Sequence, residues 1–104
     1  MERIETTIIR NLIHNEEYSR KVIPFLEPDY FERRSEKILF EEISSFIVKY
    51  GSSVTIEALN IEVENRNDVT DDEVKEILDI NQYLGNSPVD QQWLFDITEK
   101  WCRD

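Results

Sequence analysis

Apolar residues recur along this sequence with the spacing of amphipathic α-helices. Near the start, Ile4, Ile8 and Leu12 fall on one face at i, i+4 and i+8, which predicts a helix over residues 4–13. The broadest apolar stripe predicts a core helix over 35–50, and its members are Leu39, Phe40, Ile43, Phe46, Ile47 and Tyr50. Because no segment shows the period-two alternation of a half-buried strand, we predict an all-α fold.

Capping residues divide the rest of the chain into short helices. Asn15 is the predicted cap of a second helix, 16–25, which Pro24 ends or bends. Gly51 follows the core helix as a C-terminal cap, and Thr55 caps the helix after it.

Two further start signals lie in the second half of the chain. Thr70 and Glu73 predict a capping box for a helix over 71–84 that ends at Gly85. The run Ser87-Pro88-Val89-Asp90 reads as a cap, a proline at the first helical position and an acid at the third. The last predicted helix begins at this run, and its apolar face is formed by Trp93, Leu94, Ile97 and Trp101. The prediction is a compact bundle of about six short helices.

The length of 104 residues is that of one domain, which we expect to span residues 1–104. No apolar run approaches the roughly 20 residues that cross a bilayer, and no secretory signal precedes the first helix. The single cysteine, Cys102, cannot form an internal disulfide, so we expect a cytoplasmic protein. The last helix runs into Arg103-Asp104 without a cap, which suggests a piece of a longer protein.

The formal net charge is −11, from 23 acids and 12 bases. Nucleic-acid binders draw most of their affinity from basic residues that neutralise phosphates, so we expect no direct contact with DNA or RNA. Residues 57–79 hold nine acids and only two bases, Arg66 and Lys75, and so contribute −7 of the −11. This segment is either a solvated face that keeps the domain soluble or a docking face for a basic partner.

No catalytic constellation fits the residue counts. The one histidine, His14, and the one cysteine lie at opposite ends of the chain, and a helical di-iron or closed zinc site needs more ligands. A calcium loop counted from Asn65 to Glu76 lacks the glycine at its sixth position, which is Thr70. No Gly-rich phosphate loop is present. We predict no catalytic residue, cofactor or metal ion in this chain.

Aromatic side chains are the remaining candidates for a functional role. Trp93 and Trp101 are about 80° apart on one helix, and either packs in the core or anchors a protein interface. Tyr30 and Phe31 follow Pro28 in a predicted short turn and plug either the core or a neighbour. The candidate protein-interface residues, including two acids from 57–79, are Tyr30, Phe31, Trp93, Trp101, Glu73 and Glu76.

An ordered set of short segments resembles the N-terminal domain of DnaB-like replicative helicases, in the form found in T-even-type phages. The segments are Leu12-Ile13, Tyr18, Lys21-Val22-Ile23-Pro24, Tyr30-Phe31-Glu32, Phe40, Ile43, Tyr50, Ala58-Leu59-Asn60, Glu64-Asn65, Ser87-Pro88-Val89-Asp90-Gln91-Gln92-Trp93-Leu94 and Thr98-Glu99-Lys100-Trp101. Each is a cap or core position, and together they cover nearly the whole chain.

The resemblance implies a helical collar domain in a phage protein of the host cytoplasm. In this family the domain is followed by a helical hairpin, a linker and an ATPase domain that binds ATP and magnesium, and this chain has none of these. The collar supports the hexamer and contacts primase and, in some systems, the helicase loader. The expected partners are therefore further copies of the chain, primase and loader, with no membrane contact.

The charge of −11 also suggests a second hypothesis, a stand-alone acidic phage protein that mimics DNA and inhibits a host protein. Such a mimic needs its acids in regularly spaced rows, whereas these acids cluster in 57–79 and include ordinary cap positions. Competition with DNA for a nuclease or nucleoid protein distinguishes the two hypotheses.

Overall fold

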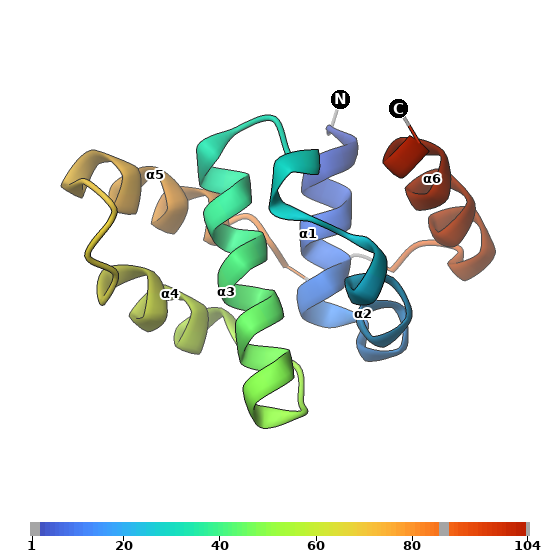
Figure 1. Ribbon diagram of the computed structural model, residues 1–104, viewed down its shortest axis with the longest axis horizontal. Coiled ribbons are helices and arrows are strands. Elements are labelled where there is room, and N and C mark those ends of the chain that lie inside the picture. The colour runs from blue at the N-terminus through green and yellow to red at the C-terminus, as the bar shows by residue number, and fades with distance from the viewer. Residues whose placement is uncertain (1–2, 86–87, 104) are drawn as a thin grey trace.

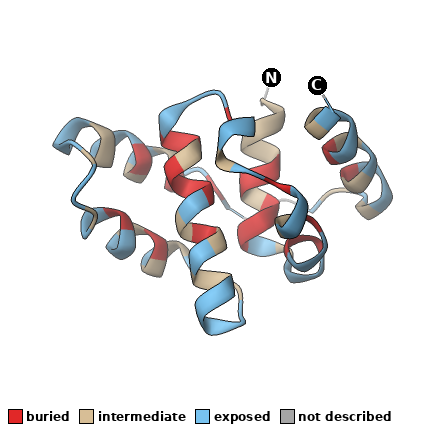
Figure 2. Cartoon of the chain, viewed as in Figure 1, coloured by how far each residue is buried: buried red, intermediate tan, exposed pale blue. Residues whose placement is uncertain are grey.

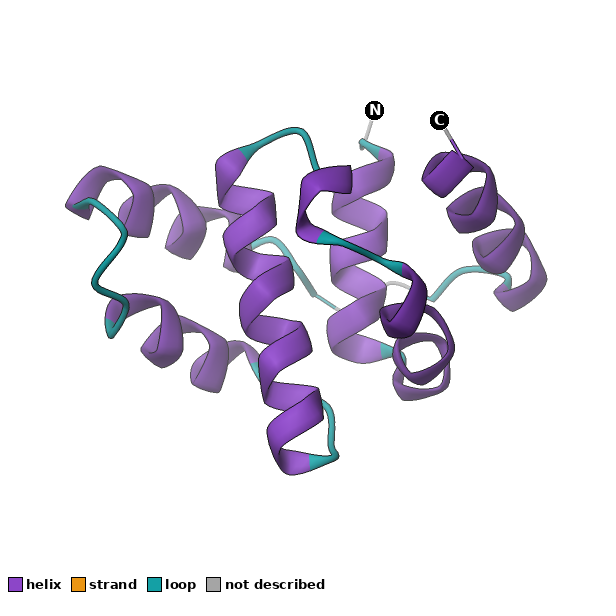
Figure 3. Ribbon diagram, viewed as in Figure 1, coloured by secondary structure: helices purple, strands orange, loops and turns teal. Residues whose placement is uncertain are grey.

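The computed structural model describes residues 3–85 and 88–103, and every regular element in these ranges is a helix (Figure 3). The elements are α1 (Ile4–His14), α2 (Glu16–Val22), η1 (Ile23–Phe25), η2 (Pro28–Tyr30), α3 (Arg34–Tyr50), α4 (Ile56–Glu64), α5 (Asp71–Asn81) and α6 (Gln91–Arg103), of which η1 and η2 are single 3-10 turns. The predicted all-α fold of about six short helices is confirmed over the described residues.

Helices α1 and α3 form the centre of the molecule, with α4 and α5 at one end and α2 and α6 at the other (Figure 1). Buried residues are concentrated in α1 and in the first part of α3, whereas the end of α3 is exposed (Figure 2). Ile8 and Leu12 of α1 and Leu39 and Ile43 of α3 are completely buried, as their helical spacing predicts. The central pair therefore supplies the core on which both ends of the molecule are built.

The predicted caps hold the helix ends in place. The side chains of Asn15 and Thr55 each accept a hydrogen bond from the backbone N–H three residues later, at 3.1 Å in both cases. Thr70 and Glu73 exchange both bonds of a capping box, at 3.1 and 2.9 Å. Gly51 ends α3 with φ = 68°, a left-handed conformation that favours glycine.

One predicted helix end is confirmed in part and another is wrong. Helical turns continue to Phe25 as predicted, but Pro24 has no N–H to continue the α-helical ladder, so α2 ends at Val22 and the chain tightens into η1. Helix α5 ends at Asn81 instead of Leu84, and the chain leaves it through i→i+3 bonds. Leu84 is still buried, and its carbonyl accepts a hydrogen bond of 2.6 Å from the His14 ring, so a tertiary contact sets this end.

The predicted start of the last helix is also wrong. Helix α6 begins at Gln91, and Pro88 precedes it instead of occupying its first position. Asp90 is the cap: its carboxylate accepts the backbone N–H of Trp93 at 2.8 Å. An aspartate at the cap satisfies a free amide and favours the helix dipole, which explains the later start. The predicted cap Ser87 lies outside the described residues.

Candidate protein-interaction site

Three of the six candidate interface residues meet where η2 packs on α6. The Phe31 ring is completely buried, with its centroid 4.9 Å from that of Trp101 and 5.3 Å from that of Phe40. Tyr30 meets Trp101 edge-on at 6.1 Å and keeps 40% of its surface exposed. Phe31 therefore fills the core, the first of its two predicted alternatives, and is not accessible to a partner in this structure.

Trp93 lies about two turns away from Trp101 on α6 and is 46% exposed. Trp101 is half-buried in the aromatic cluster, so the two tryptophans have different environments. An exposed tryptophan beside the buried Leu94 has the large, rigid contact area of an interface anchor. Trp93 remains a predicted interface residue.

Glu73 and Glu76 lie on α5, at the opposite end of the molecule from α6 (Figure 1). The Glu73 carboxylate accepts the N–H of Thr70 and a 2.6 Å bond from the Arg34 guanidinium, and both bonds lower its pKa. Glu76 is exposed. Glu73 thus has a structural role at the start of α5, while Glu76 faces outward.

A second arginine, besides Arg34, links the acidic segment to α3. Arg66, in the connection between α4 and α5, contacts Asp68 at 2.7 Å, Glu41 at 3.1 Å and Glu42 at 3.5 Å. Its hydrogen bond holds the pKa of Asp68 at about 2, while burial raises the pKa of Glu42 despite the same guanidinium. One base therefore offsets a carboxylate of this connection and two carboxylates of α3.

A second carboxylate is buried at the start of α3. Glu36 accepts a 2.7 Å bond from the guanidinium of Arg3 and a 3.3 Å bond from the backbone N–H of Arg33. Burial nevertheless raises the pKa of Glu36 above its ordinary value. The contact joins the beginning of α1 to the beginning of α3.

We expect the free energy of unfolding to be greater at about pH 5 than at about pH 7.5, and to fall again below about pH 4. Because the pKa values of Glu36 and Glu42 are raised on folding, the folded state binds protons at higher pH than the unfolded state does. The stability that these two carboxyl groups contribute is fully present below pH 4.5 and is lost as the pH rises through their pKa values in the folded state. Asp68, with its pKa held at about 2, contributes stability above 3.8 that is lost as the pH falls from 3.8 toward 2. Urea denaturation across this range measures the profile.

The control is the double variant Glu36→Gln, Glu42→Gln, which removes both raised pKa values. General relief of charge repulsion also favours the folded state as the pH falls, so the variant isolates the share that belongs to these two carboxylates. We expect the rise between about pH 7.5 and 5 to become shallower in the variant. An unchanged slope would contradict the assignment.

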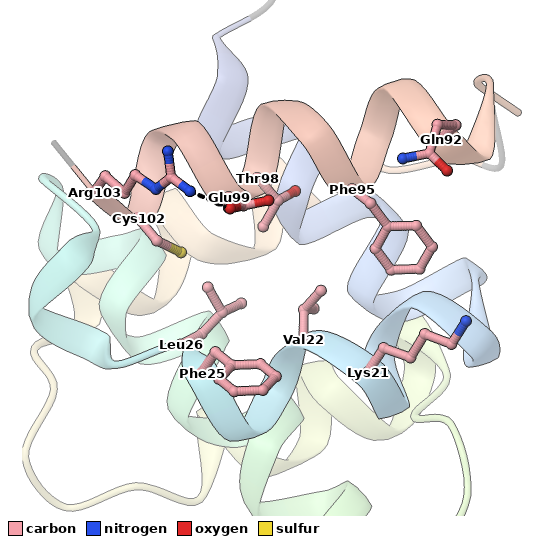
Figure 4. A pocket seen from close by; sticks show the side chains of 10 residues that line it. All are labelled: Lys21, Val22, Phe25, Leu26, Gln92, Phe95, Thr98, Glu99, Cys102 and Arg103. Carbon is pink, nitrogen blue, oxygen red and sulfur yellow. Dashed lines mark hydrogen bonds and ion pairs between the residues drawn. The ribbon is translucent and has the colours of Figure 1, made fainter.

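An apolar groove lies between α2–η1 and α6. It encloses about 590 Å³, and Figure 4 shows Val22, Phe25 and Leu26 facing Phe95 and Cys102 across it. Sequence reasoning did not single out these residues as a site. The available signal was an apolar arc on the last helix wider than one buried face requires, with Phe95 and Cys102 beside the inward-facing positions.

The inner wall of the groove is held by Tyr18 of α2. The Tyr18 hydroxyl lies 2.6 Å from Thr98 Oγ1, and its ring centroid lies 5.6 Å from that of Phe95. Both polar side chains are buried, and burial raises the Tyr18 pKa well above its usual range. The hydroxyl pair therefore stays neutral and fixes α6 against α2, because an unpaired buried hydroxyl is costly.

Within the two described ranges, no helix is long and apolar enough to cross a membrane. The same ranges hold no group of three or more His, Cys, Asp or Glu side chains placed to hold a metal ion.

No protein-family model matches the sequence. The chain is 35% identical over 96 residues to the DnaB-like replicative helicase of Enterobacteria phage T4. The match takes in 92% of this chain and 20% of that protein, so the chain spans about a fifth of its relative's length. The resemblance found in the sequence is confirmed: the chain is homologous to a domain-sized part of a DnaB-like replicative helicase.

Proposed function

We propose that this chain is a non-catalytic N-terminal collar domain of a phage replicative helicase, which supports hexamer assembly and docks primase or the helicase loader. The observation that carries the proposal is the 35% identity to such a helicase along 92% of the chain. The sequence has no Gly-rich phosphate loop, so ATP hydrolysis would belong to another part of the parent protein.

The distribution of charge supports docking of basic proteins at the α4–α5 end. This end carries most of residues 57–79, whose net charge is −7. Complementary charge raises the rate at which a basic partner associates and discriminates against acidic competitors. Glu76 is exposed there and suited to such a contact.

The acids at this end are arranged less well for mimicry of DNA. Arg66 engages Asp68 and Glu41, and Arg34 engages Glu73. Ion pairs within the domain therefore engage two of the nine acids of residues 57–79, Asp68 and Glu73. A mimic of the DNA backbone needs its acids in a regular row that faces solvent, and these two pairs interrupt such a row. The collar is therefore the function that we favour.

Sedimentation velocity of the 104-residue chain and a pull-down with the cognate primase test the proposal. We expect weak self-association and capture of primase, which weakens several-fold in the variant Glu76→Lys and is less salt-dependent there. Glu27→Lys, an equal charge change at another exposed position, is the matched control. A chain that stays monomeric and binds neither primase nor loader would falsify the collar assignment, as would displacement of DNA from a nuclease.

A further inference from the structure

The groove between α2–η1 and α6 has an exposed aromatic ring at its edge. Phe25 is 72% exposed and lines the edge of a hollow of about 590 Å³, whose other apolar lining residues include Val22, Leu26, Phe95 and Cys102 (Figure 4). An exposed apolar patch next to a concave apolar surface is typical of a site that binds another molecule. The same face thus presents both a projection and a cavity of apolar character.

The walls of the groove are neutral in a molecule of charge −11. Helices α2 and α6 together carry four acids and four bases, and η1 carries none, so their net charge is zero: Glu16, Glu17, Asp96 and Glu99 against Arg20, Lys21, Lys100 and Arg103.

Three of these bases are already paired within their own helix. Arg20 contacts Glu16 at 2.6 Å and Lys21 contacts Glu17 at 3.3 Å, while Arg103 pairs with Glu99. A partner at this face therefore meets little unbalanced charge. The best-matched partner surface is itself apolar and neutral, which is the character of this face on a second copy.

The position of the acidic segment favours the same occupant. Residues 57–79, with a net charge of −7, lie across α4 and α5 at the far end of the molecule from α2 and α6 (Figure 1). Two copies joined through α2 and α6 keep these acidic ends apart, so that salt screens their repulsion. Any pairing through α4 and α5 would bring like charges together.

We propose that this groove pairs with the same groove of a second copy of the chain, with Phe25 of each copy seated in the hollow of the other. The pairing is isologous: one surface meets itself about a two-fold axis, so the projection and the cavity are each used twice. The assignment rests on the proposed function, since it names the surface through which the collar domain self-associates.

Sedimentation velocity and alkylation of Cys102 by iodoacetamide, each over a wide range of concentration, test this pairing. Cys102 is the one cysteine of the chain and lines the groove, so its reaction rate reports whether the groove is covered. We expect the chain to dimerise and the rate to fall as dimer forms. Phe25→Glu should raise the dimer dissociation constant at least about tenfold, because each dimer loses two buried aromatic contacts.

The matched control is Tyr83→Glu, which places the same charge at an aromatic residue that is 79% exposed on α5's side of the molecule. It should leave dimerisation and Cys102 protection close to those of the unaltered chain. Circular dichroism should show both variants folded, since neither ring is buried.

The possible failures are distinguishable. A dimer that survives Phe25→Glu, or whose Cys102 reacts at the monomer rate, overturns the groove assignment and leaves the collar function standing. A monomeric chain whose Cys102 is protected by primase also overturns it, because the groove is then primase's. A chain that shows neither self-association nor primase binding overturns the proposed function as well.

Discussion

The variant Phe31→Ala is expected to lower the free energy of unfolding by about 3–5 kcal/mol. The Phe31 ring is 0% exposed and touches both Phe40 of α3 and Trp101 of α6, so its removal leaves a cavity between η2 and two helices. A domain of this size has a total stability of about 5–15 kcal/mol, which makes the loss a large share. Urea denaturation followed by tryptophan fluorescence measures it, because Trp101 lies against the altered site.

Tyr30→Ala is the matched control for this experiment. Tyr30 is the adjacent residue, is also aromatic and also contacts Trp101, but it is 40% exposed. We expect its removal to cost about 1 kcal/mol, since a partly exposed ring loses less apolar burial. Equal losses in the two variants would show that Phe31 does not fill the core in the way described.

The variant Leu94→Ala is expected to cost about 2–5 kcal/mol and to loosen α6 in particular. Leu94 is completely buried in the first half of α6, where its side chain holds the helix against the core. Loosening should expose Cys102 later in the same helix, so iodoacetamide should react with it faster. Thermal denaturation and the alkylation rate together measure the effect.

Trp93→Ala is the matched control for Leu94→Ala. Trp93 is the larger side chain and the neighbour of Leu94, but it is 46% exposed, so its removal should cost less than removal of the leucine. The result would contradict the description of α6 if truncating the tryptophan proved the more destabilising. Because Trp93→Ala should remain folded, it also allows Trp93 to be tested as an interface anchor by primase capture.

Local signals predicted most helix boundaries. The caps at Asn15, Thr55 and Thr70 were identifiable because each bond joins a side chain to a backbone group only three residues away. The left-handed end at Gly51 is likewise a property of one residue's backbone. The end of α5 was missed because it depends on the contact of Leu84 with His14, far away in the sequence.

The residues of the candidate site also depended on contacts between distant parts of the sequence. The sequence could not show which of the adjacent residues Tyr30 and Phe31 is exposed, because the direction of each ring depends on where α6 packs. Phe31 proved to be core, whereas Tyr30 remained partly exposed. The groove was missed altogether, because Phe25 and Phe95 are 70 residues apart in the sequence and line one cavity only when α2 and α6 are packed together.

By itself, therefore, the sequence determined the helical character of the chain, most of its caps, the concentration of acid in residues 57–79 and the resemblance to a replicative helicase. Only the tertiary structure decided which apolar residues close the core and which stay exposed, and that the acidic end and the neutral groove lie on opposite sides. The physical reason is the separation along the sequence over which each kind of interaction acts. Helix periodicity and capping act over three or four residues, whereas cavities and charged faces arise between elements that meet only on folding.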